Sequence, residues 1–138
     1  ADRRQRQMCI RDSLNSLLWR IVVLTDDGYL EGFDSVLVDE GTMSFTRHES
    51  DVKALHDAGN VWAVQRLQWF AGGFIRADVV DGRLMISDLR MGQEPHYVFR
   101  HVVAEYANPR WTAITPERAV MAFDRVNLDE IWHRINNP

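Results

Sequence analysis

The chain has 138 residues, 46% of them hydrophobic and 26% charged, and its formal net charge is -4 at pH 7. A chain of this length and composition can bury a core of its own, which excludes disorder of the whole chain. The negative charge argues against nucleic acid as the main partner, because nucleic-acid-binding surfaces are usually basic. Apolar runs such as Ile21 to Leu24 are far shorter than the roughly 18 to 20 residues that cross a bilayer, so we expect the chain as given to be soluble.

Residues 1–13 have a composition unlike the rest of the chain, with four Arg, two Gln and no periodic pattern. No apolar segment follows the basic residues, so this is not a signal peptide. The run from Arg6 to Ser13 resembles a translated sequencing adapter, of the kind that contaminates some metagenomic reading frames. We therefore predict a non-native or disordered arm over 1–13, a single domain over 14–138, and a native protein that extends upstream. The alternative is a native basic arm that frays in solution.

Three short strands are predicted for the beginning of the domain. Residues 17–25 and 29–37 are rich in β-branched and aromatic residues, and Asp26-Asp27-Gly28 between them is typical of a turn. A third strand is predicted over 43–47.

The register of the first two strands depends on the length of the loop between them. A three-residue loop sets Arg20 opposite Asp34, and a two-residue loop sets it opposite Ser35. The pairing with Asp34 is preferred, because opposite charges across a strand pair are favourable.

Helical spacing replaces the strand pattern over 51–70, with an interruption at Gly59-Asn60. Asn60 is expected to cap a second helix, and Gly72-Gly73 to end it. The apolar face of that helix is formed by Val61, Val64, Leu67 and Gln68 and is broadened by Trp62, Trp69 and Phe70. We expect most of the five Trp in the core; the alternative is an aromatic ligand pocket.

The clearest hairpin joins 74–80 to 83–91 through Asp81-Gly82, a dipeptide typical of two-residue turns. Its register places Ile75 opposite Asp88.

Beyond the hairpin, the sequence predicts a strand over 96–106, a helix that opens at Thr115-Pro116, and a helix over 127–136. The order of elements predicts an α+β fold, with an antiparallel β-sheet of two three-stranded units packed with helices. The expected core residues are Trp19, Ile21, Val23, Phe33, Val64, Leu67, Phe70, Leu84, Ile86, Val98 and Trp132.

An acid and a base stand two residues apart at the end of the predicted strand, in Asp88 and Arg90. Strand side chains alternate between faces, so the two point the same way as Leu84 and Ile86 and continue an apolar stripe. A charge pair in such a place needs a partner or a function. The candidate ligand-binding residues, for an anionic or polar ligand, are Trp19, Arg20, Arg47, Asp88 and Arg90. The alternative is a structural ion-pair network.

Residue patterns for catalysis or metal binding are absent from the sequence. The five His show no metal-site spacing, no nucleophile elbow or phosphate-binding loop occurs, and the single Cys lies in the arm. We predict no catalytic residue and no metal ligand in this chain, although a distant convergence of His48, His96 and Asp88 stays open.

Three segments carry a resemblance to a known family over roughly residues 14–107. They are Asn15–Arg20 running into Gly28–Gly32, Arg66–Phe70 with Gly73-Phe74, and Ile86–Gly92. Together they resemble the C-terminal soluble region of the bacterial YdjM-like membrane-bound metal-dependent hydrolases. One departure is that relatives are expected to have Ser-His before Gly-Phe, where this chain has Ala71-Gly72.

The resemblance implies a soluble accessory domain, regulatory or for interaction, of a metal-dependent hydrolase. The metal ligands of that family, His and Asp, are expected in an N-terminal membrane-embedded part, so this chain would lack the catalytic metal site and hold no cofactor. Its partner would be that missing part, in the bacterial inner membrane, and the fragment alone would be inactive. The alternative is a freestanding small ligand-binding module or hydrolase that uses Asp88, Arg90 and Arg20. Exposed edge strands would permit a homodimer.

Overall fold

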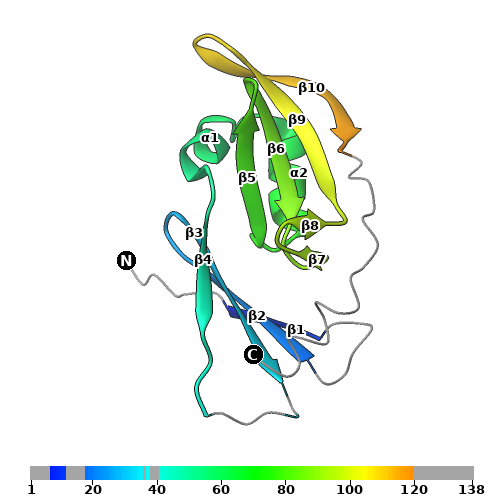
Figure 1. Ribbon diagram of the computed structural model, residues 1–138. Helices are drawn as coiled ribbons and strands as arrows, with labels where there is room; N and C mark the ends of the chain where they lie inside the picture. Colours follow the sequence, from blue (N-terminus) through cyan, green and yellow to red (C-terminus); the bar gives the residue numbers. More distant parts are fainter. Residues whose placement is uncertain (1–6, 12–17, 36, 38–40, 120–138) are drawn as a thin grey trace. The chain divides into compact units, whose positions relative to one another are not determined.

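The computed structural model describes residues 7–11, 18–35, 37 and 41–119 (Figure 1). The chain divides into two compact units, one containing the described residues up to His48 and the other those from Glu49 onward. Both are built mainly of antiparallel strands, and the described helices are two short ones in the second unit. The α+β prediction is therefore confirmed only in a coarse form: helices and antiparallel strands are both present, but sheet is the dominant structure.

The first unit contains a four-stranded sheet in the order β1-β2-β3-β4. Its strands are β1 (Gln7–Arg11), β2 (Leu18–Leu24), β3 (Gly28–Ser35) and β4 (Phe45–Glu49). β4 begins two residues later than the predicted third strand. Alternation along β2 buries Leu18, Arg20 and Val22 and leaves Trp19 at the surface, so a charged residue occupies a buried position in the sheet.

Both predicted registers for the first hairpin are wrong. Arg20 lies opposite Phe33, and Trp19 lies opposite Asp34. The reason is the position of the turn, which lies earlier in the chain than either predicted register requires. The backbone N–H of Thr25 donates to the carbonyl of Gly28 at 2.9 Å, so pairing continues to these residues and only Asp26-Asp27 separate them.

Part of the arm has regular structure, because β1 pairs antiparallel with β2 and places Cys9 opposite Ile21. The expectation of a disordered arm thus does not describe Gln7–Arg11. That the arm is non-native stays a prediction, as does a single domain over 14–138, because a division into compact units does not say how the chain unfolds.

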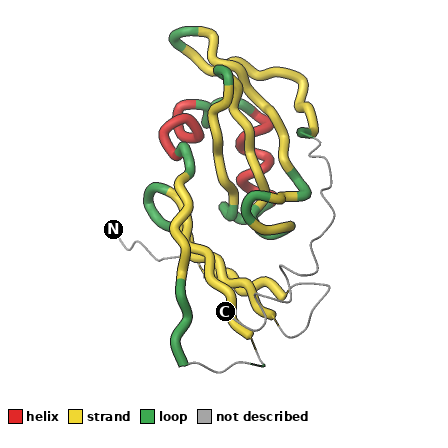
Figure 2. The backbone as a smooth tube through the Cα atoms, viewed as in Figure 1, coloured by secondary structure: helices red, strands yellow, loops and turns green. Residues whose placement is uncertain are grey.

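The second unit packs two helices against one face of a four-stranded sheet (Figures 1 and 2). The helices are α1 (Val52–Asp57) and α2 (Trp62–Phe70), which confirm the prediction of two helices within 51–70. The sheet has the order β10-β9-β6-β5, from β5 (Ile75–Val80), β6 (Arg83–Asp88), β9 (Arg100–Ala107) and β10 (Arg110–Arg118). A small two-stranded sheet is formed by β7 (Gly92–Gln93) and β8 (His96–Tyr97).

Local chemistry explains most of these boundaries. The side chain of Asp51 caps α1 by accepting the backbone N–H of Ala54 at 2.9 Å. The predicted cap Asn60 is wrong, because α2 starts after Val61, without a side-chain cap. Asp81 and Gly82 both have positive φ, 51° and 71°, which gives the predicted two-residue hairpin with Ile75 opposite Asp88.

Three further predictions need correction. The helix expected from Thr115 is wrong, because this segment is part of β10 and pairs with β9, with a register shift between Ala113 and Glu117. The strand expected over 96–106 is divided into β8 and β9. The sheets have four, four and two strands rather than three and three, because β1 and β10 each add a strand. The predicted helix over 127–136 lies outside the described residues.

The core of the second unit lies between the helices and the sheet. Val64, Leu84 and Ile86 are buried there as predicted, and Leu67 packs against them. The prediction is wrong for Trp19, Phe70 and Val98, which are exposed by 37%, 61% and 38%, while Trp132 lies outside the described residues. The buried cluster contains Ala54, Ala58, Ala71, Ala77 and Ala104. Helices and sheet approach closely over such small side chains, which leaves no space for most large rings.

Candidate functional site

The charged residues at the end of β6 form an internal ion pair. Arg90 donates to the Asp88 carboxylate through Nε at 3.0 Å and Nη2 at 2.7 Å, and its backbone N–H donates to the same group at 2.9 Å. Asp88 is 6% exposed and its backbone N–H donates to the carbonyl of Phe99. The hydrogen bond from Arg90 to Asp88 raises the pKa of the guanidinium.

The pair was expected, but its geometry is different from that of a strand. β6 ends at Asp88, and Arg90 lies in the turn that follows, so it reaches back to the carboxylate. Gly92 closes this turn with φ 116°, and a Cβ there would lie 2.4 Å from the carbonyl oxygen of His96. The Ser-Asp-Leu-Arg-Met-Gly run is thus a compact turn in which glycine is required by the close approach of β8.

Arg90 also lies over an exposed aromatic ring. Its guanidinium carbon is 5.0 Å from the centre of the Phe70 ring, at the end of α2. One turn earlier on the helix, Arg66 lies 4.9 Å from the centre of the Trp69 ring. Such cation–π contacts hold a guanidinium flat against a ring while its polar edge stays available to solvent or a ligand.

The outer side of α2 is strongly aromatic. Trp62 and Trp69 are exposed by 71% and 72%, and Phe70 by 61%. The two Trp are seven residues apart, which is two helical turns, so they share one side of the helix. We call the set Trp62, Arg66, Trp69, Phe70 and Arg90 the aromatic–arginine surface.

Sequence reasoning missed this surface. It placed Trp62, Trp69 and Phe70 on a widened buried face, whereas Val64 alone in α2 is fully buried. The signal was present in Gln65 and Arg66, which stand between the two Trp on the same side of the helix. Two polar residues at that spacing mark a solvent-facing side.

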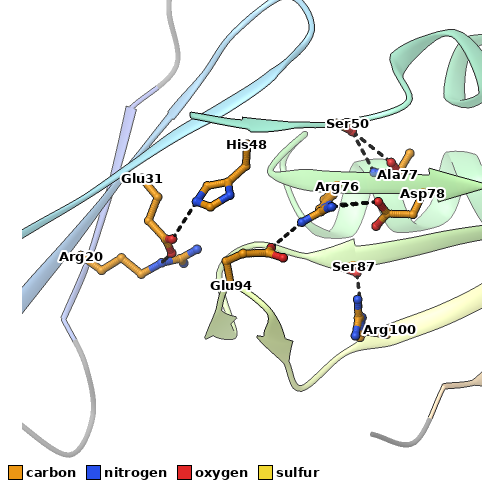
Figure 3. Close-up of polar contacts among 10 residues, drawn as sticks. All are labelled: Arg20, Glu31, His48, Ser50, Arg76, Ala77, Asp78, Ser87, Glu94 and Arg100. Carbon is orange, nitrogen blue, oxygen red and sulfur yellow. Dashed lines mark hydrogen bonds and ion pairs between the residues drawn. The ribbon is translucent and has the colours of Figure 1, made fainter. Parts of the chain in front are cut away.

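The first unit holds its own buried charges (Figure 3). Arg20 Nε donates to Glu31 Oε1 at 2.5 Å, and the two side chains are 5% and 6% exposed. The other carboxylate oxygen lies 3.2 Å from His48 Nε2, and the His48 ring stacks on Tyr29. Glu31 therefore joins β2 and β4 through β3, with both of its oxygens engaged.

The remaining predicted site residues lie apart from this group. Arg47 is exposed and pairs with Asp27 in the hairpin turn, and this hydrogen bond lowers the pKa of the Asp27 carboxyl. Trp19 points to the opposite side of β2 from its neighbour Arg20. The five candidate residues are thus divided between the units, with Trp19, Arg20 and Arg47 in the first and Asp88 and Arg90 in the second.

A polar cluster not anticipated from the sequence lies on the sheet of the second unit, on the face opposite the helices (Figure 3). Arg76 forms ion pairs with Asp78 at 3.0 Å and with Glu94 at 2.6 Å, and Arg100 donates to the Ser87 hydroxyl at 3.3 Å. Alternation on β5 explains it, since Ile75 and Ala77 face the core and Arg76 and Asp78, which alternate with them, do not.

The comparisons add no relative: no family model, no curated protein and no solved structure matches the chain. Among the described residues, no group of three or more His, Cys, Asp or Glu could hold a metal ion. Within the same ranges, no helix has the length and apolar character needed to cross a membrane.

Proposed function

We propose that this chain is an accessory domain of a bacterial membrane-bound metal-dependent hydrolase and does not contain the catalytic metal site. The proposal begins from the three segments that resemble this family. Each of them falls on a structural junction: the β2–β3 hairpin, the end of α2 with the turn that follows it, and the turn after β6.

One observation carries the proposal. The buried pair between Arg20 and Glu31 joins the two parts of the first segment that carries the resemblance, Asn15–Arg20 and Gly28–Gly32. In the third segment, Asp88 and Arg90 are likewise paired with each other. Charges that satisfy one another inside a protein serve mainly to fix its structure, because breaking such a pair leaves an uncompensated charge. The charged residues of the resemblance therefore support a folded accessory domain.

A partner follows from the same proposal. The accessory domain would act on, or respond to, the N-terminal membrane part, which would carry the metal and the reaction. The alternative, a ligand-binding module built on Asp88, Arg90 and Arg20, has weaker support, because Arg20 and Asp88 are buried within their ion pairs and the three residues are divided between the two units.

The gene upstream of Leu14 provides the test. We expect an open reading frame that encodes several hydrophobic helices with His and Asp residues. A start codon immediately before Leu14 would contradict the proposal. As a biochemical test, the chain should co-purify with the separately produced N-terminal part in detergent, and turnover of a hydrolase substrate by the chain alone would argue for the alternative.

A further inference from the structure

We propose that the aromatic–arginine surface of α2 binds the headgroup region of an anionic lipid bilayer. This goes beyond the accessory role, because it depends only on the side chains of the second unit and not on what the chain is joined to. Its occupant is a bilayer that carries acidic phospholipids.

The rings of α2 are unusually exposed. Trp62, Trp69 and Phe70 each leave more than 60% of their area in solvent, although α2 buries Val64 completely on its other side. Single exposed apolar residues are ordinary, but three large rings on one short helix form a patch that marks an interaction site. Trp has an apolar body and a polar N–H, and it is the residue that concentrates at membrane–water interfaces.

The charge of this surface is complementary to acidic phospholipids. α2 carries no acidic residue, and its only charged residue is Arg66. Arg90 lies beside the helix end, and its carboxylate partner Asp88 is buried beneath it. Both guanidinium groups lie against rings, so they are held at the level where a lipid phosphate would lie when the rings enter the interface.

A bilayer fits these residues better than a nucleic acid does. Exposed aromatic rings can stack on the bases of a single-stranded nucleic acid, but proteins that bind such nucleic acids also have a basic groove that follows the phosphates. The aromatic–arginine surface has two basic residues, Arg66 and Arg90, which suits separate lipid phosphates better than a continuous row of nucleic-acid phosphates. A short aromatic helix face with two cations is instead the composition of an interfacial contact.

The test uses the purified chain and vesicles of equal parts phosphatidylglycerol and phosphatidylcholine, with vesicles of phosphatidylcholine alone as the comparison. Sedimentation gives the partition coefficient, and quenching of Trp fluorescence by brominated lipid reports ring insertion. We expect the double substitution Trp62→Ser and Trp69→Ser to lower partition about tenfold or more, since each ring loses apolar contact. Arg66→Gln should lower it about fivefold, the effect of about one basic residue at an anionic surface.

Two control substitutions test whether vesicle binding depends on the aromatic–arginine surface and not on exposed charge or apolar area elsewhere. Lys53→Gln removes a cation on α1 that is 87% exposed, and Val80→Ser removes an exposed apolar side chain in the β5–β6 hairpin; neither should change partition. All variants are also measured in a background where the arm arginines are replaced by Gln, because a basic arm attracts anionic vesicles by itself. Those arginines are Arg3, Arg4, Arg6 and Arg11.

Several outcomes would overturn the proposal. They are absence of binding to the anionic vesicles, equal binding to both kinds of vesicle, partition unchanged by the Trp and Arg66 substitutions, and binding to a single-stranded oligonucleotide in place of vesicles. Circular dichroism shows whether each variant is folded. If the double Trp variant is unfolded, the proposal is tested by the partition of Arg66→Gln and by lipid quenching of the unsubstituted chain. A chain that does not bind vesicles would contradict the lipid proposal without affecting the proposed accessory function. A start codon before Leu14 would contradict the accessory function without affecting the measured vesicle binding.

Discussion

The two units differ in the side chains that stand out at their buried and exposed positions. The first places charged residues, Arg20 and Glu31, at buried positions of its sheet and satisfies them by pairing. The second buries an apolar cluster beneath two helices and leaves the three aromatic rings of α2 outside. Small side chains allow a helix to pack closely on a sheet. A buried charge is tolerated where its partner lies within hydrogen-bonding distance on a neighbouring strand. The neighbouring layer, and not hydrophobicity alone, therefore determines which residue types are buried.

The largest effect is expected from Glu31→Leu. It leaves Arg20 buried beside an apolar side chain, and removing one partner of a buried pair costs about 3 to 5 kcal/mol. Denaturant unfolding measures this loss, and hydrogen exchange should locate it in β2 and β3. The double substitution Arg20→Met and Glu31→Leu should recover most of the stability. Equal loss of protection in β5 and β6 would show that the two units unfold together and would end the comparison between them.

Leu84→Ala is the corresponding test in the second unit. Leu84 is 0% exposed and belongs to the cluster beneath the helices. Deleting its side chain leaves a cavity and should cost about 3 kcal/mol. Thermal unfolding gives the size of the effect, and Val80→Ser, at an exposed position of the same sheet, provides the control. A cost near zero would mean that this core can collapse around the cavity.

A smaller effect is expected from Gly92→Ala, which tests the turn after β6. The new Cβ would meet the carbonyl of His96 at a positive φ, so we expect a loss of about 2 to 3 kcal/mol. Gly82 also has a positive φ but has open space around it, and Gly82→Ala should cost only about 1 kcal/mol. If both variants lose the same stability, the close approach of β8 does not constrain the Ser-Asp-Leu-Arg-Met-Gly run.

The smallest effect is expected at the surface of α1, where Lys53 donates to Asp57 at 2.6 Å. This hydrogen bond lowers the pKa of Asp57 from its ordinary 3.8. A lowered carboxyl pKa stabilises the folded state above the unfolded value, and the contribution disappears as the pH falls through the folded value. Asp57→Asn should therefore lower the melting temperature slightly at neutral pH and leave it unchanged in strong acid. A larger difference in acid than at neutral pH would contradict this sign.

Prediction from the sequence was most successful where local chemistry is decisive. The hairpin at Asp81-Gly82 was located with its register, because only a few turn types fit a two-residue loop. The proximity of Asp88 and Arg90 was also anticipated. It was expected from side-chain alternation along one strand, whereas in the structure Arg90 lies in the turn after β6 and reaches back to Asp88. The register at Arg20 was missed because the two-residue turn lies at Asp26-Asp27, earlier in the chain than the two-residue loop that would set Arg20 opposite Ser35.

The sequence alone determined the alternation of strands, the two helices over 51–70, and a charged pair at the end of β6. Tertiary structure decided that β10 is a strand, because a segment with helix-like capping residues gains more from pairing with β9. It also decided that Trp62 and Trp69 lie outside, since periodicity separates two sides of a helix without stating which side meets the sheet. The small residues on the other side of α2 made that choice, because only they permit close contact between the helix and the strands.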